Sequence, residues 1–589
     1  MKAPISRNRQ SIIGAIFILL TATLAVAPQL IRGTSCGHDF DFHLVSWLDA
    51  LDSWRHGVFY PHWTPSPNYG AGEPRFIFYP PLTWMLGAVL GAILPWSAVP
   101  ITLTFLLLAA TGFATRALAR YALSDSAATL AGCITIFSGY TLYTAYERSA
   151  FAELSGGFWI PLALLLVLHE RPSAQPQFLW RRTFDGSAGP LALVVAGSWL
   201  SNAPLGVMTC YLLAGFALAV ALLTRSWAPF IRAVVASALG IGLTAVYLVP
   251  AAVEQRWVDI RQATDDPGLL IQNSWLFAHH ADPQLKLHDV ELFKVSIIAV
   301  LMIGLAIAAV LIAWLRGTLP GKRRFWLPLA LIPLAVLFLQ FPASFPVWNA
   351  LPKLHFLQFP WRWLVVLEAP LGILLAAAIW PASRPRKAAI VATCTIAFIA
   401  ATILAGRFYF ESCYPEDAIP SMLASFSNGD GFEGTDEYEP PGADDSIVPL
   451  RLPGACLVTD PTAILGAGDP DSTPEWSPDQ HTCQAVFPLI KPAADHLRVQ
   501  AATSHPGYLI LRLRSYPAWQ VRVNGQPLSL IRRDDGLMAV PVPSGPVDVT
   551  IDWTTPTDVL IGRVISFLAL ILLACLSFIE RRAAQPRLS

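Results

Sequence analysis

Long apolar runs constrain this chain more than any other feature. Runs of about 20 residues, the length that crosses a hydrocarbon core of about 30 Å as a helix, recur along the 589 residues. They occupy residues 11–31, 98–117, 127–146, 154–170, 188–203, 205–224, 231–250, 291–315, 325–341, 363–380, 388–405 and 558–578. Because 54% of the residues are hydrophobic and only 14% are charged, the sequence predicts a mainly α-helical, polytopic membrane bundle with about twelve transmembrane helices.

The distribution of Lys and Arg between the loops predicts how these helices are oriented. Basic pairs such as Arg116 with Arg120 and Arg225 with Arg232 follow alternate spans, and most loop carboxylates fall on the opposite side. Cytoplasmic loops of membrane proteins are rich in Lys and Arg, so both termini are expected in the cytoplasm and the large loops outside it. The 40 basic and 40 acidic residues balance, which gives no basic surface for a nucleic acid partner.

The lengths of the outer loops divide the chain into three parts. A transmembrane domain is expected over residues 1–405, with a long first outer loop at residues 32–97. Residues 406–557 are long enough to form an extracytoplasmic domain, and residues 558–589 would form the final transmembrane helix and a basic cytoplasmic tail. The functional groups are therefore expected outside the cytoplasm.

Within the first outer loop, the stretch "FHLVSWLDALDSW" has the spacing of an amphipathic helix. Its apolar residues recur every three or four positions, at Leu44, Trp47, Leu48, Leu51 and Trp54. Ser46, Asp49, Ser53 and Arg55 fall on the opposite face. The pattern predicts a helix that lies on the membrane surface with its polar face toward water.

The extracytoplasmic segment changes character along its length. It begins with the acidic, Gly- and Pro-rich passage "NGDGFEGTDEYEPPGADD", which has little to bury and is expected to be irregular or mobile. From His496 onward it contains short runs rich in β-forming residues: "LRVQAAT", "YLILRLR", "AWQVRVNG", "LMAVPV" and "VDVTIDW". Asn524-Gly525 is a strong hairpin signal. A small β-sandwich before the last helix is the simplest arrangement.

The eight cysteines separate by location. Four lie in apolar runs and are expected to pack as small apolar residues. The other four, Cys36, Cys413, Cys456 and Cys483, face the predicted oxidising side, where disulfides persist. Three pairings are open, of which Cys456 with Cys483 is preferred and Cys36 with Cys413 completes the set.

The stretch "GHDFDFH" concentrates ionisable side chains directly after the first apolar run. His38, Asp39, Asp41 and His43 lie within six residues. The two carboxylates could hold a divalent cation, Mg²⁺ or Mn²⁺, or one of them could act as a general base. In the alternative interpretation, Asp41 only caps the helix that begins nearby.

The stretch "YERSAFAE" follows the third apolar run and contributes Glu147, Arg148 and Glu153. The arginine is suited to binding a phosphate, and a glutamate could serve as a second acid or as a metal ligand. The alternative is an Arg/Glu pair that only anchors a loop at the membrane interface.

Two further residues near the tenth run are candidates for substrate contact. Arg362 in "QFPWRW" lies between Trp361 and Trp363 at an outer membrane boundary, where it could bind a lipid phosphate or belong to an ordinary aromatic belt. Glu368 lies six residues further on, inside the run, where a carboxylate is costly unless it is paired or faces a wet cavity.

Several motifs, in the same order along the chain, resemble two overlapping groups of bacterial membrane proteins. These groups are the YfhO-like proteins and the proteins with a membrane domain described as 6-pyruvoyl-tetrahydropterin synthase-related. The motifs are "GHDFDFH", "GVFYPHW", "GAGEPRFIFYPPLTW", "YERSAFAE", "LPKLHFLQFPWRWL" and "YPAWQVRVNGQP". Such proteins look like glycosyltransferases of the GT-C class, which carry an acidic motif in the first outer loop and use polyprenyl-phosphate sugars as donors. The resemblance implies a bacterial inner-membrane protein with Asp39 and Asp41 in the acidic motif.

The residues and the resemblance together favour a membrane glycosyltransferase that moves a sugar from a polyprenyl-phosphate donor to an extracytoplasmic glycan, lipid or polymer. The expected catalytic residues are Asp39, Asp41, Glu147 and Glu153, with Asp39 and Asp41 also the expected cation ligands. The expected substrate-binding residues are His38, His43, Arg148, Arg362 and Glu368. The alternative is a non-catalytic transporter or flippase, or an assembly factor for lipid-linked cell-envelope glycans. A transporter predicts paired charges along a transmembrane route, whereas the acids here gather in outer loops.

Overall fold

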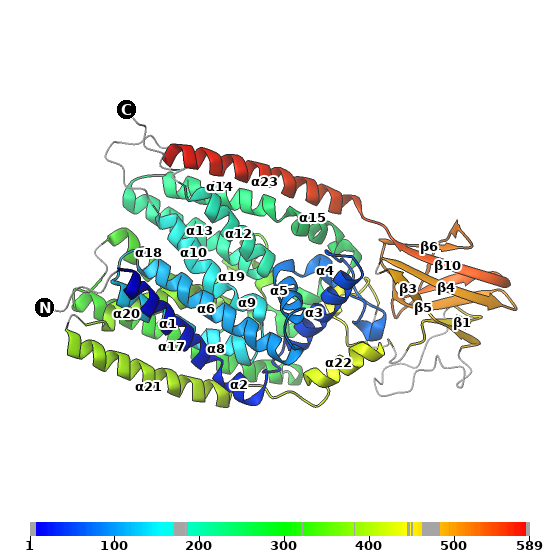
Figure 1. Ribbon diagram of the computed structural model, residues 1–589, viewed down its shortest axis with the longest axis horizontal. Coiled ribbons are helices and arrows are strands. Elements are labelled where there is room, and N and C mark those ends of the chain that lie inside the picture. Colours follow the sequence, from blue (N-terminus) through cyan, green and yellow to red (C-terminus); the bar gives the residue numbers. More distant parts are fainter. Residues whose placement is uncertain are drawn as a thin grey trace.

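The computed structural model describes residues 7–169, 183, 186–319, 322–381, 383–443, 448, 452–461, 483–493 and 495–584. Figure 1 shows an elongated molecule in which a bundle of helices carries a β region at one end. The first helix, α1 (Arg7–Ala25), begins at the end of the bundle that lies away from the β region, and the last helix, α23 (Thr557–Ala584), ends there (Figure 1). The end of the predicted basic tail, residues 585–589, lies outside the described residues.

Among the described residues, seven helical segments are long and apolar enough to cross a membrane, or nine if two bent pairs each count as one span. The seven contain α6 (Val99–Ala119), α9 (Phe151–Leu154) with α10 (Gly156–Leu168), α13 (Ala203–Thr224), α17 (Lys286–Leu315), α20 (Leu364–Ile379), α21 (Arg384–Phe408) and α23. The bent pairs are α14 (Ala228–Leu243) with α15 (Ala245–Glu254), at 70°, and α18 (Arg323–Leu339) with α19 (Phe345–Ala350), at 98°.

The remaining predicted spans correspond to shorter apolar helices, namely α1, α7 (Asp125–Ile136) with α8 (Gly139–Tyr146), and α12 (Ala188–Ser201). Their ends follow from capping residues. Ser138 caps α8, because its side chain accepts from the backbone N–H of Thr141. Asn202 separates α12 from α13 and caps α13 in the same way, because its side chain accepts from the backbone N–H of Leu205 at 2.9 Å. A membrane protein with several apolar helices is thus confirmed, while twelve spans stays a prediction.

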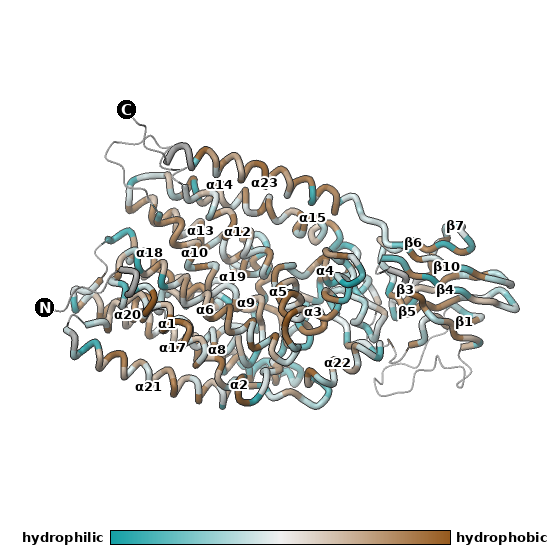
Figure 2. The backbone as a smooth tube through the Cα atoms, in the orientation of Figure 1, coloured by the Kyte–Doolittle hydropathy of each residue, from teal (hydrophilic) through white to brown (hydrophobic). Residues whose placement is uncertain are grey.

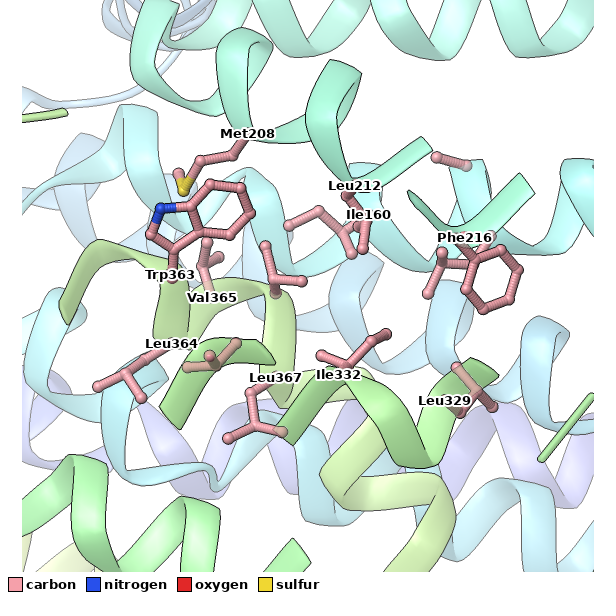
Figure 3. Packing of buried hydrophobic residues seen from close by; sticks show 14 of the residues in the cluster. Ile160, Met208, Leu212, Phe216, Leu329, Ile332, Trp363, Leu364, Val365 and Leu367 are labelled. Atoms are coloured by element: carbon pink, nitrogen blue, oxygen red, sulfur yellow. The ribbon is translucent and has the colours of Figure 1, made fainter. Parts of the chain in front are cut away.

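The core of the bundle is apolar and continuous across helices far apart in sequence. Figure 3 shows side chains of α10, α13, α18 and α20, with Trp363 directly before α20, meeting there: Ile160, Met208, Leu212, Phe216, Leu329, Ile332, Trp363, Leu364, Val365 and Leu367. In contrast, within the hydrophobic 18-residue stretch of each helix, only 11% of α21 and 22% of α23 is buried. These two helices carry hydrophobic residues on the outside of the bundle (Figure 2), as lipid contact requires.

The first outer loop contains the α-helices α3 (Phe40–Arg55), α4 (Arg75–Phe78) and α5 (Pro81–Gly91), and α2 (Ala27–Arg32) directly precedes it. The predicted amphipathic helix is α3, but the prediction that its polar face meets water holds only for Arg55, at the end of the helix, and is wrong for the other three residues. Ser46, Asp49 and Ser53 are all buried. Asp49 accepts from the backbone N–H and the hydroxyl of Ser66, at 3.1 and 2.6 Å. The loop after α3 therefore folds back over the polar face and satisfies it.

The acidic passage after α22 (Ile419–Asn428) is irregular, as expected, but its described part is packed against the first outer loop. The backbone of Phe432 pairs with Tyr69 and Ser66, at 2.8 and 3.0 Å. Tyr438 and Glu439 are buried. The expectation that this passage has little to bury is wrong for these residues, because Phe78 of the first outer loop stacks on Tyr438, while Asp259 and Arg514 contact Glu439.

The C-terminal β region consists of two five-stranded antiparallel sheets, with strand orders β2-β1-β5-β9-β8 and β3-β4-β10-β6-β7. The strands are β1 (Ala455–Val458), β2 (Ala485–Phe487), β3 (Ile490–Ala493), β4 (His496–Thr503), β5 (Gly507–Arg514), β6 (Trp519–Val523), β7 (Gln526–Pro527), β8 (Ile531–Arg532), β9 (Leu537–Val542) and β10 (Gly545–Trp553). Leu509 and Met538 of one sheet share a hydrophobic cluster with Val499 and Val549 of the other.

Five strands coincide with the five β-rich runs of the sequence, so the predicted C-terminal β region is confirmed. In β10, Val547, Val549 and Ile551 are buried, as their alternation predicts. Asn524 and Gly525 connect β6 to β7 with φ of +50° and +81°, the left-handed conformation that a two-residue hairpin turn requires.

Both predicted disulfides are present. Cys456–Cys483 joins β1 to the segment before β2, across a sequence separation of 27 residues. Cys36–Cys413 connects the start of the first outer loop to the segment after α21. The second bond therefore joins the "GHDFDFH" motif to a part of the chain 377 residues away.

Candidate functional site

The motifs "GHDFDFH" and "YERSAFAE" are joined through their backbones. The N–H of Asp39 donates to the carbonyl of Arg148 at 2.9 Å, and the N–H of His38 donates to that of Glu147 at 3.3 Å. The N–H of Gly37 donates to the hydroxyl of Ser149 at 3.1 Å. A Cβ atom on Gly37 would lie 2.3 Å from the carbonyl oxygen of Glu147. Only glycine permits this approach, which places the two motifs side by side.

A buried charge cluster lies next to this junction. Nη1 of Arg148 is 2.5 Å from Oε2 of Glu153, and Nε of Arg362 is 3.6 Å from the same oxygen. The hydroxyl of Tyr140 donates to the other oxygen of Glu153. Arg148 and Glu153 are only 5% and 3% exposed, and buried charges must be paired to be tolerated. Glu153 thus holds two arginines from distant segments in one place.

Asp39 lies at the open edge of the charge cluster. Its carboxylate is 3.6 Å from Nη2 of Arg148, and its side chain is 38% exposed. It occupies the position before α3 where a side chain could cap the helix, yet it forms no capping bond. Burial opposes the charge of Arg148, but Glu153 and Asp39 outweigh that effect and raise the pKa of Arg148. Asp39 is therefore an accessible carboxylate beside a permanent cation.

A cavity of about 450 Å³, the helix-lined cavity, opens onto this cluster. Its polar lining includes Asp39, Arg148, Glu153, Lys353 and Arg362. The rest of its lining is largely apolar and includes Val207, Leu248 and Ala251 from α13 and α15. A cavity lined by both charged and apolar residues is suited to an amphiphile whose anionic head meets the arginines.

A second cavity of about 370 Å³, the loop-lined cavity, adjoins the first. It is lined by His38, Asp41 and Arg75 from the first outer loop, and by residues of the acidic passage. Both cavities are lined by Asp39, Tyr79, Arg362, Glu437 and Tyr438. These shared residues are where the two cavities meet, and Asp39 is therefore reachable from both.

Three site residues were missed by sequence reasoning. Glu437 lies in the passage expected to be mobile, and burial together with the nearby Glu73 raises the pKa of Glu437 to about 7. Arg75 forms an ion pair with Glu73 at 2.6 Å, and its guanidinium lies 4.0 Å from the ring centre of Phe42. Lys353 lines the helix-lined cavity. The motifs "GAGEPRFIFYPPLTW" and "LPKLHFLQFPWRWL" contain Arg75 and Lys353 and were the available signals for these two residues.

Three predicted site residues lie away from both cavities. His43 is fully buried among the rings of Phe42, Trp47, Tyr79 and Phe151, and burial lowers the pKa of His43 to about 4. A direct substrate contact by His43 is excluded by this packing.

The other two residues are occupied by partners within the protein. Glu147 forms an ion pair with Lys294 on α17. Glu368 is buried in α20 and accepts from the hydroxyl of Thr141 at 2.7 Å. Neither residue lines the helix-lined or the loop-lined cavity, so the structure gives Glu147 and Glu368 a supporting position rather than a substrate-facing one.

Few side chains of the described residues are placed to bind a cation. Within the described ranges, no three His, Cys, Asp or Glu side chains lie close enough together to hold a metal ion. Asp39 and Asp41 both line the loop-lined cavity and are the nearest approach to a ligand pair. Mg²⁺ is commonly bound by one or two carboxylates together with substrate phosphates, so this pair fits a cation that arrives with a phosphate-bearing substrate.

Comparisons with known proteins give a family match. A family model described as "6-pyruvoyl-tetrahydropterin synthase related domain; membrane protein" matches residues 76–412. A search of curated proteins finds no match.

Among solved structures, the chain is similar to the apo oligosaccharyltransferase of Archaeoglobus fulgidus, with 12% identity and a TM-score of 0.42 over 72% of this chain and 61% of that one. The archaeal oligosaccharyltransferase AglB from the same organism, in complex with an inhibitory peptide and a dolichol-phosphate, gives 14% identity and 0.43 over 73% and 61%. The arabinofuranosyltransferase AftD from Mycobacteria gives 19% identity and 0.43 over 83% of this chain and 32% of that one. The chain thus spans about three fifths of the archaeal proteins and about one third of the mycobacterial one.

Proposed function

This chain belongs to the 6-pyruvoyl-tetrahydropterin synthase-related family of membrane proteins, and we propose that it is an integral membrane glycosyltransferase. It would transfer a sugar from a polyprenyl-phosphate donor to an extracytoplasmic glycan, lipid or polymer. One observation carries the proposal: Asp39, Arg148 and Arg362 line a single cavity whose remaining lining is largely apolar. The reaction needs a proton acceptor, phosphate ligands and space for a lipid in one place, and this cavity supplies all three.

The donor would lie in the helix-lined cavity, with its isoprenoid chain against the apolar residues and its phosphate against the basic residues. The apolar residues of α13 and α15 suit the first units of an isoprenoid chain, because burying apolar surface is favourable. Arg148, Arg362 and Lys353 suit the phosphate. Glu153 acts as a positioning residue in this scheme, since it pairs with both arginines and holds them toward the cavity.

The chemistry is a single displacement at the anomeric carbon of the sugar. A hydroxyl oxygen of the acceptor forms a bond to that carbon, while the bond from the carbon to the phosphate oxygen breaks and the phosphate keeps the electron pair. The hydroxyl proton passes to the carboxylate of Asp39. The negative charge that grows on the leaving phosphate is stabilised by Arg148 and Arg362, which are already in place before the reaction.

A divalent cation, Mg²⁺ or Mn²⁺, is proposed as an addition to this site. Asp39 and Asp41 would hold it together with the donor phosphate. The cation would neutralise charge on the phosphate. His38 lines the loop-lined cavity together with Asp41, and it would therefore contact a substrate in that cavity. Its imidazole lies 3.5 Å from the carboxylate of Glu291.

We further propose that the protein lies in the bacterial inner membrane with both termini in the cytoplasm. The outer loops and the β region would then face outward. The acceptor would reach Asp39 through the loop-lined cavity, which opens on the side of the acidic passage. This arrangement keeps the donor in the bilayer and the acceptor in water.

The test is transfer by the purified full-length protein from a panel of radiolabelled polyprenyl-phosphate sugars, with and without a chelator. We expect transfer with at least one donor, and its loss in Asp39→Asn at unchanged protein abundance. Asp265→Asn, at an exposed loop carboxylate, is the matched control and should transfer normally. Undiminished transfer by Asp39→Asn would overturn the assignment. Movement of the labelled lipid between leaflets without transfer would overturn the enzyme in favour of a transporter.

A further inference from the structure

A third cavity, of about 260 Å³, lies where the β region meets the first outer loop; we refer to it as the seam cavity. Its lining comes from segments far apart in sequence. Asp52, Ser53 and His56 come from the last turns of α3, residues 58–65 follow them, both β sheets contribute, and Arg563 comes from the first turns of α23. A cavity assembled from so many segments depends on the β region being docked on the helical bundle.

Aromatic rings form one side of the seam cavity. Trp519 and Trp553 lie on adjacent strands with ring centres 5.0 Å apart and planes at 86°. The ring of His62 lies nearly parallel to that of Trp553, at 12° and 6.1 Å. Trp63 contacts both tryptophans. Trp63 and Trp519 are only 8% and 4% exposed, whereas His62 and Trp553 are partly exposed, so these two rings can contact a ligand with little loss of conformational entropy.

The rest of the lining combines apolar residues, such as Leu489 and Leu513, with polar groups of both signs. Lys491, Arg512 and Arg563 are basic, while Asp52 and Asp495 are acidic. A phosphate or sulfate would meet the carboxylates as well as the cations, so this set does not select a bare anion. A neutral ligand rich in hydroxyl groups can donate to the carboxylates, accept from the cations and lay its C–H faces on the rings. Carbohydrate has this chemistry.

The size of the seam cavity and its distance from Asp39 bear on the kind of carbohydrate. A volume of about 260 Å³ is below the range of pockets that enclose a drug-sized ligand, so it suits one part of a longer molecule. The helix α3 connects the two sites directly. Asp39 precedes its first residue and Ser53 lies near its end, which at 1.5 Å per residue separates them by about 20 Å. That distance spans several sugar rings.

We propose that the seam cavity binds a neutral stretch of an oligosaccharide acceptor, several sugars away from the hydroxyl that reacts at Asp39. This inference rests on the proposed glycosyltransferase function and narrows it. The acceptor is a glycan chain, and α3 sets the number of sugars between the bound stretch and the reacting end.

Binding tests the seam cavity separately from catalysis. Calorimetric titration of the purified full-length protein with a neutral disaccharide and with a longer neutral oligosaccharide should show tighter binding of the longer ligand. The double variant Asp52→Ala/His56→Ala removes two half-exposed side chains at the rim of the cavity, 44% and 51% exposed. We expect it to weaken binding of the longer ligand by about tenfold or more. His505→Ala, at an exposed position on β-region surface outside the cavity lining, should bind normally.

Two further measurements separate this inference from the proposed function. Asp39→Asn should keep the binding while losing transfer, so that binding survives even if the catalytic assignment fails. In transfer assays, the double variant should raise the KM for the longer acceptor and leave transfer to a disaccharide unchanged. The variant Trp553→Phe is titrated in parallel. Thermal unfolding of the same variant shows whether any weakening of binding results from a destabilised β region. Equal binding of both ligands, unchanged binding in the double variant, or a preference for inorganic phosphate over the neutral ligands would overturn the inference.

Discussion

The backbone N–H of Asp39 donates to the carbonyl of Arg148 at 2.9 Å, while the carboxylate of Asp39 lies 3.6 Å from the guanidinium of the same arginine. The proposed proton acceptor and the proposed phosphate ligand are thus held to each other twice. A displacement of one motif moves the other with it. The distance between the reacting hydroxyl and the leaving phosphate is therefore set by the contact between two loops rather than by either loop alone.

Gly37→Ala should separate these loops. The added Cβ would lie 2.3 Å from the carbonyl oxygen of Glu147, and relieving such an overlap in a packed site costs about 1–3 kcal/mol. We expect a lower unfolding temperature and a loss of transfer of at least about tenfold, since small displacements of reacting groups slow catalysis strongly. Gly215→Ala is the control, because nothing lies within 4 Å of its Cβ position. Native transfer rates in Gly37→Ala would contradict the proposed geometry.

Glu153→Gln should leave Arg148 and Arg362 without their shared anion. Removing one partner of a buried ion pair costs about 3–5 kcal/mol, so the variant should unfold at a lower temperature. In variant protein that remains folded, the arginines lose their alignment and the KM for the donor should rise. Thermal unfolding and donor titration measure the two effects. Glu416→Gln, at an exposed carboxylate, should change neither quantity.

Glu437 should make donor binding depend on pH. Burial and the nearby Glu73 raise the pKa of Glu437 to about 7, so its carboxyl is neutral below that pH and negative above it. A negative Glu437 would repel the donor phosphate in the cavity that both are proposed to share. We expect the KM for the donor to rise as the pH increases through about 7, and we expect Glu437→Gln to abolish that rise. A native pH profile in Glu437→Gln would exclude Glu437 as its source.

Asp49 should make the stability of the protein fall as the pH rises. Burial, only partly offset by the hydrogen bonds from Ser66, raises the pKa of Asp49 from 3.8 to about 7. Between these values the folded protein binds more protons than the unfolded chain, so stability is fully present below about pH 4 and is lost as the pH rises through about 7. The slope is at most about 1.4 kcal/mol per pH unit. Unfolding temperatures of Asp49→Asn across this window should vary less with pH than those of the native protein, whereas Asp265→Asn should retain the native slope.

Local sequence patterns were sufficient for the features that depend on local chemistry. The alternation in "VDVTIDW" predicted the buried face of β10, because side chains in a strand alternate between faces whatever the strand packs against. Asn524-Gly525 predicted its turn, since few other residues adopt positive φ at low cost. The outer location identified the four cysteines that form disulfides but left three pairings open, and the preference for Cys456 with Cys483 left Cys36 for Cys413.

Long-range packing decided the features that the sequence could not show. The spacing in α3 correctly separated an apolar face from a polar one, yet nothing in that spacing states that Ser66 will return to bond Asp49. The sequence suggested that His43 contacts the substrate. In the structure His43 is buried among aromatic rings contributed by other segments. Glu437 enters the site because the first outer loop covers its neighbours. Each outcome depends on a contact between residues far apart in the chain.

The Cys36–Cys413 bond also has a consequence for biogenesis. Its two thiols are 377 residues apart, so Cys36 emerges early in synthesis and its partner only after α21 has been made. The nascent chain must therefore carry a reduced Cys36 beside the acidic motif until nearly the whole membrane domain has been inserted. Oxidation then becomes a late maturation step, and a cell that cannot form disulfides would accumulate full-length protein whose outer motif is not yet tied down.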